Sequence, residues 1–155
     1  METFVANVAS PVGPFGISGD DTAVTAIYLP WEQRRASKGP APRTVARCAE
    51  QLEEYLAGER RDFTVTLAAV DATTFQLDVW DALRDIPYGE VRTYAEIALH
   101  VNRPRASRAV GNANHANPYP VIVPCHRVVA ANGLGGYGGG EHVKRFLLEL
   151  EGVRC

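Results

Sequence analysis

Cys125 and His126 are neighbours in the segment PYPVIVPCHRVV, between an apolar run that ends at Pro124 and a glycine-rich loop. This cysteine has three possible roles. It could be a small buried apolar residue, a metal ligand together with the histidine, or a nucleophile. A nucleophilic cysteine needs a base and an orienting acid nearby because only the thiolate attacks. The sequence offers His126 and Glu151 for these two tasks.

A metal site has little support in the sequence. Adjacent residues rarely converge on one ion, the chain has no CxxC pair, and we interpret His100 and His115 as polar surface or groove residues. The cysteines Cys48, Cys125 and Cys155 are an odd number spread along the chain, which predicts reduced thiols and no disulfide framework.

The composition is that of a soluble globular protein. The chain has 155 residues, of which 46% are hydrophobic and 22% charged, so either one domain or two small lobes would be ordinary. Its start, METFVANVAS, has no basic segment before an apolar stretch, and no window approaches the ~18 apolar residues of a membrane span. With reduced thiols as well, we expect a cytoplasmic protein.

The net charge of −2 hides an asymmetry between the two halves of the chain. Residues 1–80 hold 7 Lys and Arg against 11 Asp and Glu, giving −4, whereas residues 81–155 hold 9 against 7, giving +2. Within residues 92–127, Glu96 is the single acid beside five arginines, which are Arg92, Arg103, Arg105, Arg108 and Arg127. These arginines are a candidate anion-binding face, although surface arginines are commonly just solvated charge.

The N-terminal half predicts a small sheet and one helix. Two apolar runs in residues 14–30 flank Gly19-Asp20-Asp21, which indicates a hairpin, and alternation in residues 62–70 indicates a further strand. Residues 44–57 form a helical pattern that Gly58 ends, with Cys48 on the apolar face and therefore in the core. The other members of that face are Val45, Leu52, Tyr55 and Leu56.

From residue 73 the pattern changes to successive helices. A threonine cap opens a helix with Phe75, Val79 and Leu83 on one face, and Pro87 with Gly89 ends it. Residues 93–100 and 104–115 predict two short helices joined by a tight turn, as in a helix-turn-helix, although generic helical hairpins share this pattern. A final helix over residues 141–153 packs back onto the lobe through an apolar face of Val143, Phe146, Leu147 and Leu150.

These patterns give two expected domains, residues 1–72 and 73–155. In the second of the two paired helices, Arg105, Ser107 and Arg108 occupy the first turns, the end that a DNA-reading helix inserts into a groove.

Four segments carry a resemblance to a known family. PCHRVV follows SRAVGNANHANPYPVIV, with TYAEIA before it and GGYGGGEHVKRFLLELEG after it. In this order, over roughly residues 75–152, the chain closely resembles the O6-alkylguanine-DNA alkyltransferases, also called methylated-DNA–protein-cysteine methyltransferases. The resemblance implies an α+β fold. Its N-terminal lobe would be ribonuclease H-like, with a small antiparallel β-sheet and a helix, and its mostly helical C-terminal lobe would carry the helix-turn-helix and an active-site loop.

The resemblance also implies roles for single residues. Cys125 accepts the alkyl group, His126 acts through a water as its base, Glu151 holds the histidine, and Asn117 braces the turn that carries the cysteine. Tyr94 crowds the phosphate beside the lesion and contacts the base, and Arg108, flanked by Arg105 and Ser107, replaces the flipped nucleotide in the stack. The remaining implied positions are in the base pocket, where Cys125 and Val128 offer backbone carbonyls, Pro120 and Tyr137 form walls, and Gly138 and Gly139 lie close to the base. Gly138 stands where many relatives carry serine, so a side-chain contact is lost there.

The chemistry implied is direct reversal of DNA damage. Guanine O6 is stacked inside the duplex, so a thiol in a protein reaches its alkyl carbon only after the nucleotide is extruded. Transfer to sulfur makes a thioether, which thiol exchange cannot reverse, so each molecule is consumed in one turnover. No cofactor is required, because the lesion supplies its own activated alkyl group. The expected partner is double-stranded DNA containing alkylated guanine, bound by a monomer, with clustering along DNA left open.

Two alternatives remain open. A lesion-sensing DNA-binding protein of the same fold would not repair, but relatives of that kind replace the cysteine, which is intact here. A cysteine hydrolase using Cys125 and His126 would need an oxyanion hole and a substrate cleft, and would not need the basic helix.

Overall fold

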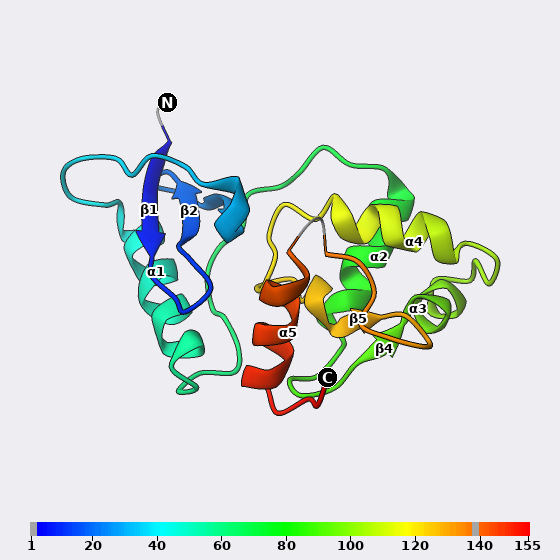
Figure 1. The fold of residues 1–155 in the computed structure, drawn as a ribbon. Helices are drawn as coiled ribbons and strands as arrows, with labels where there is room; N and C mark the ends of the chain where they lie inside the picture. Colours follow the sequence, from blue (N-terminus) through cyan, green and yellow to red (C-terminus); the bar gives the residue numbers. More distant parts are fainter. Residues whose placement is uncertain (1–2, 138–139) are drawn as a thin grey trace. The chain divides into compact units, whose positions relative to one another are not determined.

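The computed structural model describes residues 3–137 and 140–155, and the chain forms two compact units, residues 1–70 and 71–155 (Figure 1). The first unit holds a three-stranded sheet and one helix, and the second is mostly helical. The expected α+β fold with an antiparallel N-terminal sheet is confirmed.

The sheet of the first unit is antiparallel and has the order β1-β2-β3. Its strands are β1 (Phe4–Val8), β2 (Phe15–Gly19) and β3 (Val24–Tyr28). The β2–β3 hairpin confirms the predicted turn at Gly19-Asp20-Asp21, where the Asp20 carboxylate accepts from the backbone N–H groups of Thr22 and Ala23. Helix α1 (Arg43–Leu56) packs on the sheet and buries Cys48 and Tyr55 completely, and a short 3-10 helix, η1 (Pro30–Glu32), lies between β3 and α1.

The strand predicted within residues 62–70 does not form. The segment makes one isolated parallel bridge, Leu67 with Val24, through backbone bonds of Val24 N to Thr66 O and of Ala68 N to Val24 O. Earlier in the segment, the backbone N–H of Thr64 donates to the side chain of Gln51 on α1, and Gln51 donates back to the Thr64 hydroxyl. The segment therefore bonds partly to α1 and partly to β3, without forming a continuous strand ladder.

The second unit begins with α2 (Thr74–Arg84), whose N-cap Thr73 exchanges hydrogen bonds with Gln76. A two-residue strand, β4 (Arg92–Thr93), pairs in parallel with β5 (Val128–Val129). Helix α3 (Tyr94–His100) follows β4 directly, with Thr93 as its cap. After it come α4 (Ser107–His115), the 3-10 turn η2 (Cys125–Arg127) and α5 (Glu141–Leu150).

Helices α3 and α4 pack together as a helix-turn-helix (Figure 1). Helix α4 begins at Ser107, three residues later than predicted, because residues 103–106 form a turn closed by Ala106 N donating to Arg103 O. Arg105 therefore lies in the turn before the helix. The indole N–H of Trp80 donates to Ala113 O over 2.8 Å and joins α2 to α4.

Helix α5 buries Val143, Lys144, Leu147 and Leu148. Of the four residues predicted on its buried face, Phe146 and Leu150 are only half-buried, and a lysine takes part in their place. Among the described residues, none of the helices has the length and apolar character that crossing a membrane requires.

Candidate active site

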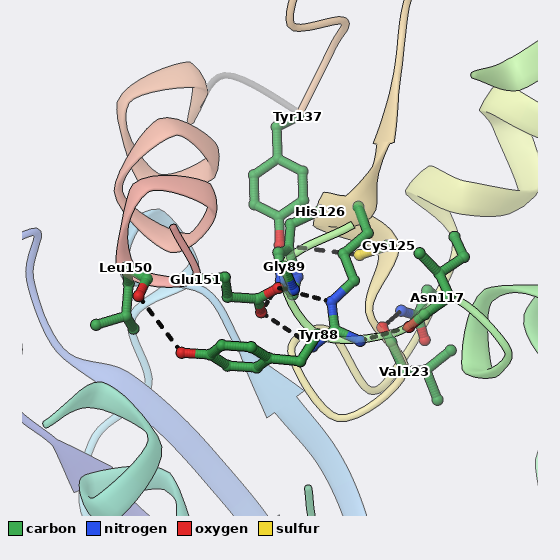
Figure 2. Close-up of polar contacts among 11 residues, drawn as sticks. Tyr88, Gly89, Asn117, Val123, Cys125, His126, Tyr137, Leu150 and Glu151 are labelled. Atoms are coloured by element: carbon green, nitrogen blue, oxygen red, sulfur yellow. Dashed lines mark hydrogen bonds and ion pairs between the residues drawn. The ribbon is translucent and has the colours of Figure 1, made fainter. Parts of the chain in front are cut away.

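The candidate site is built on the turn η2, which follows directly after Pro124. Cys125 is 4% exposed and His126 is completely buried. The Cys125 sulfur lies 3.8 Å from the hydroxyl oxygen of Tyr137, and Figure 2 shows this hydroxyl pointing toward the thiol. The backbone of Cys125 is held by its N–H, which donates to Val123 O at 2.7 Å. The thiol is therefore fixed in a buried position beside an aromatic hydroxyl.

Asn117 lies at the base of the loop that leads to the cysteine. Its Nδ2 donates to Val123 O at 2.8 Å, and its Oδ1 accepts from Tyr119 N at 3.0 Å (Figure 2). The loop needs such support because Val121, a β-branched residue, has a left-handed φ of 76°, which is strained. These bonds hold the loop in one conformation directly before Cys125.

Glu151 directly follows α5 and lies against His126. The histidine Nε2 is 2.7 Å from Glu151 Oε2, and both side chains are completely buried (Figure 2). The other carboxylate oxygen, Oε1, accepts from Gly89 N at 3.1 Å. Burial lowers the pKa of His126, and the Glu151 carboxylate opposes this by raising it. The structure thus brings the expected histidine and glutamate together across 25 positions of sequence.

Arg127 is the main correction to the sequence analysis, which counted it in an anion-binding face. Its side chain is buried, with Nε 2.8 Å from Glu151 Oε1 and Nη2 3.0 Å from Oε2. Its Nη1 donates to Ile86 O at 2.7 Å. Because the Arg127 guanidinium is paired with the buried Glu151 carboxylate, this arginine does not form part of the exposed basic surface.

Lys144 is a second buried cation that the sequence analysis missed. Its Nζ donates to Val128 O at 2.5 Å and to Gly136 O at 3.3 Å. Burial lowers the pKa of Lys144 to about 8. Burial also raises the pKa of the Cys125 thiol, while hydrogen bonds from Asn117 and Tyr137 and the charge of Lys144 act in the opposite direction. The resting cysteine is therefore a protonated thiol in surroundings that can favour a thiolate.

Both carbonyls expected to receive a guanine amine already accept a hydrogen bond. Val128 O accepts from Lys144, and Cys125 O accepts from Asn114 Nδ2 at 3.1 Å. A carbonyl has two lone pairs, so each can accept a second donor. Of the other pocket residues, Pro120 and Tyr137 are buried, whereas Gly138 and Gly139 lie outside the described residues.

The residues expected to bind DNA differ in exposure. Arg105 in the turn and Arg108 on α4 are exposed, and Ser107 is half-buried at the first position of α4. Tyr94 opens α3 and is half-buried, with its hydroxyl 3.5 Å from Gly136 O. Arg92 pairs with Glu90 at 3.2 Å. The exposed part of the predicted basic face is therefore confined to the helix-turn-helix, where Arg103 is also exposed.

The other two cysteines differ in exposure. Cys48 is in the core of the first unit, where burial raises its pKa to about 12, and Cys155 is exposed. Residues 3–137 and 140–155 contain no cluster of three or more His, Cys, Asp or Glu side chains that could bind a metal ion.

Fold and site together define an α+β protein of two compact units. One of these units holds both the helix-turn-helix and a buried cysteine next to a histidine that is paired with a glutamate. Two family models match this architecture. Residues 74–153 match the DNA-binding domain of 6-O-methylguanine DNA methyltransferase, and residues 4–69 match its ribonuclease-like domain. The chain belongs to the 6-O-methylguanine DNA methyltransferase family, as the sequence resemblance indicated.

Individual relatives cover nearly the whole chain. It is 44% identical over 154 residues to a methylated-DNA–protein-cysteine methyltransferase of Methanosarcina acetivorans, covering 96% of this chain and 98% of the relative. A protein of the same name from Mycobacterium bovis is 46% identical over 152 residues, covering 96% and 92%. The Mycobacterium tuberculosis OGT protein, solved in complex with DNA, superposes with a TM-score of 0.83 at 45% identity, covering 95% of this chain and 91% of that one.

Proposed function

We propose that this protein acts as a methylated-DNA–protein-cysteine methyltransferase that repairs O6-alkylguanine in duplex DNA by one irreversible transfer of the alkyl group to Cys125. The observation that carries the proposal is the arrangement on η2. The buried thiol and His126 are consecutive residues of one short turn, and Glu151 fixes the histidine ring at 2.7 Å.

The reaction follows from these groups. The thiol proton of Cys125 passes through a water to His126, and the sulfur attacks the alkyl carbon opposite O6. The new S–C bond forms as the C–O6 bond breaks, its electron pair stays with the guanine, and in the net reaction the thiol proton ends on that base. The hydrogen bonds from Asn117 and Tyr137 and the nearby charge of Lys144 favour the developing thiolate.

The buried position of the thiol requires the base to leave the duplex. Unstacking costs a few kcal/mol, and less for a lesion whose pairing is already damaged. We assign Arg108, exposed on α4, to fill the vacated stack, and Arg105 and Ser107 to contact the backbone beside it. Tyr94 contacts the base and its phosphate. Within the pocket, Pro120 and Tyr137 flank the base, and the carbonyls of Cys125 and Val128 accept from its amine.

This proposal gives the two domains different tasks. Residues 73–155 bind DNA and carry the alkyl acceptor, while residues 1–72 form a separate α/β lobe. Each molecule acts once, as a monomer and without a cofactor, because the lesion supplies its own activated alkyl group and a thioether is not reversed by thiol exchange.

The test is the intact mass of the protein before and after incubation with duplex DNA containing O6-methylguanine. We expect one added methyl group per chain, on the peptide bearing Cys125. Cys48 and Cys155 should remain unmodified. Cys125→Ser is the matched control, and it should bind the DNA with nearly unchanged affinity and gain no mass. Multiple turnovers, steady ester hydrolysis or a methyl group on Cys48 would each contradict the proposal.

A further inference from the structure

Arg127 makes three hydrogen bonds within the site, and none of the contacts described above joins it to the thiol. Its planar guanidinium grips both oxygens of Glu151, at 2.8 Å through Nε and at 3.0 Å through Nη2. Such a bidentate pair adds geometric specificity to a charge-assisted contact. The third donor, Nη1, is fixed by Ile86 O at 2.7 Å. The guanidinium is thus fixed by Glu151 on one side and by Ile86 O on the other, which holds it against the carboxylate.

The carboxylate of Glu151 is stabilised in its ionised form. It accepts two hydrogen bonds from Arg127 and one from Gly89 N at 3.1 Å, and it lies 2.7 Å from His126 Nε2. Hydrogen bonds to the charged form favour ionisation, and an ionised carboxylate only accepts. The network therefore assigns the proton of the neutral imidazole to Nε2. Its other nitrogen, Nδ1, is then the basic atom.

A buried carboxylate whose only charged partner was a histidine would draw a proton onto the imidazole, because an uncompensated internal charge is costly. Arg127 already supplies the compensating charge. We propose that Arg127 is a positioning residue that keeps His126 neutral in the resting protein, so that Nδ1 is free of a proton and ready to accept the one that leaves Cys125. This inference rests on the proposed function for its consequence, but its physical claim concerns the charge on one histidine.

The other charged and titratable groups around His126 agree with this assignment. Lys144 on α5 contributes a second positive charge, and with Arg127 and burial it lowers the pKa of His126 against the opposite effect of Glu151. Cys125 on the same turn is a neutral thiol at rest. Tyr88, from the loop before β4, lies with its ring centre 5.7 Å from the Arg127 guanidinium carbon. Helix α2 also packs on η2, and its charged residues, Asp78, Asp81 and Arg84, are exposed.

The experiment is an NMR titration of the histidine ring signals in the whole protein. The chain has four histidines, and His126 is the completely buried one. In the unmodified protein we expect His126 to be neutral at pH 7. In Arg127→Met its pKa should rise by at least about one pH unit, since an unbalanced opposite charge shifts a pKa by about that amount or more. Arg127→Lys, which keeps the charge but not the planar fork, should raise it less.

The rate of alkyl transfer should follow the same titration. A protonated imidazole cannot accept the thiol proton, so the acid limb of the pH–rate profile should move to higher pH in Arg127→Met by the same amount as the NMR midpoint. Tyr88→Phe is the matched control. It removes the 3.4 Å bond to Leu150 O and disturbs the packing around Arg127 without changing charge, and the His126 titration should not move.

Three results would overturn the inference. They are a cationic His126 at pH 7 in the unmodified protein, an unchanged His126 pKa in the Arg127 variants, and a transfer rate that falls by one factor at every pH. If Arg127→Met does not fold, the unmodified protein and Arg127→Lys still decide. The NMR result does not depend on transfer, so failure of the proposed function would appear separately, as a missing mass gain with the histidine titration intact.

Discussion

The ammonium nitrogen of Lys144 lies 2.5 Å from the carbonyl oxygen of Val128, inside the protein. The same nitrogen reaches Gly136 O at 3.3 Å and lies 5.8 Å from the ring centre of Tyr137. One side chain of α5 therefore connects the strand after the cysteine with the segment that carries the tyrosine. Burial disfavours the charged form of this ammonium group and lowers the pKa of Lys144 to about 8 from its ordinary 10.5.

That lowered pKa predicts how stability depends on pH. Between about pH 8 and 10.5 the unfolded chain still holds the Lys144 proton and the native state has lost it, so the free energy of unfolding rises with pH across this window. A span of about 2.5 pH units at roughly 1.4 kcal/mol per unit corresponds to about 3 kcal/mol. Lys144→Met should lack this rise.

The measurement is urea unfolding of the unmodified protein and Lys144→Met at pH 7.5 and 10, taking the difference between the two proteins at each pH. The difference is needed because Cys48 and Cys125, whose pKa values are raised, lower stability over the same range in both proteins. Arg145→Met is the control, since Arg145 makes only a surface pair with Glu141 at 3.5 Å. A rise that persists in Lys144→Met would disprove the assignment.

Lys144 and Arg127 also mark the limit of prediction from sequence. Helical periodicity located α5, but a lysine in an amphipathic pattern normally faces water. Its burial is possible here because the carbonyl oxygens of Val128 and Gly136 accept hydrogen bonds from its ammonium group. The composition of residues 92–127 likewise gave no means of distinguishing Arg127 from the exposed arginines Arg105 and Arg108. The signal that could have distinguished it was its place directly after Cys125 and His126, with Glu151 the acid already expected near them.

The elements that were predicted correctly are those that local chemistry determines. The β2–β3 hairpin follows from Gly19-Asp20-Asp21, and the start of α2 follows from its threonine cap. The strand expected within residues 62–70 was wrong because the segment makes one isolated bridge to β3, while Thr64 N donates to a side chain distant in sequence, that of Gln51. The 2.7 Å contact between His126 and Glu151 spans 25 positions, and no local pattern encodes it. The expectation of that pair came from family resemblance.

A second prediction concerns Asn117, whose amide holds both Val123 O and Tyr119 N. Asn117→Ala leaves these two backbone groups without their partner and should lower the free energy of unfolding by about 3 kcal/mol. It should also slow alkyl transfer, because the strained loop before Cys125 loses its support. Asn112→Ala, an exposed change on α4, is the control and should alter stability by less than about 0.5 kcal/mol. Chemical denaturation and single-turnover kinetics on both variants test this, and equal stabilities would count against it.

A third prediction compares two glycines next to Tyr94. Gly135 has a φ of 81°, and a Cβ there would lie 2.8 Å from the Tyr94 hydroxyl oxygen and 3.1 Å from Ala130 N. Gly135→Ala should therefore cost at least about 1 kcal/mol and displace the tyrosine ring. Gly111 is inside α4, where a Cβ would meet Tyr94 at an ordinary 3.9 Å. Gly111→Ala should stabilise the helix by about 0.5 to 1 kcal/mol. Thermal unfolding of the two variants tests this prediction, and the changes in their unfolding free energies must have opposite signs.

The last prediction separates Arg108 from Arg105, two of the exposed arginines of the helix-turn-helix, by their proposed tasks. Arg108 is assigned to the gap left by a flipped base, so Arg108→Ala should slow transfer from O6-methylguanine in duplex DNA even at saturating DNA. We expect the transfer rate to fall at least about tenfold. The arginine offsets part of the free energy of unstacking, and each ~1.4 kcal/mol of that stabilisation that is lost slows the reaction by a factor of ten. Reaction with free O6-benzylguanine, which needs no extrusion, should hardly change.

Arg105→Ala is the matched comparison, because Arg105 is also exposed but lies in the turn before α4. As a backbone contact, its loss should weaken DNA binding, reduce the salt slope by about one and leave the saturated transfer rate unchanged. Transfer rates at saturating DNA and the salt dependence of binding should be measured for both variants. Equal losses on free base and duplex in Arg108→Ala would mean that this arginine shapes the pocket. A loss of affinity alone would make it a backbone anchor like Arg105, and in either case the base-replacement role would have to be abandoned.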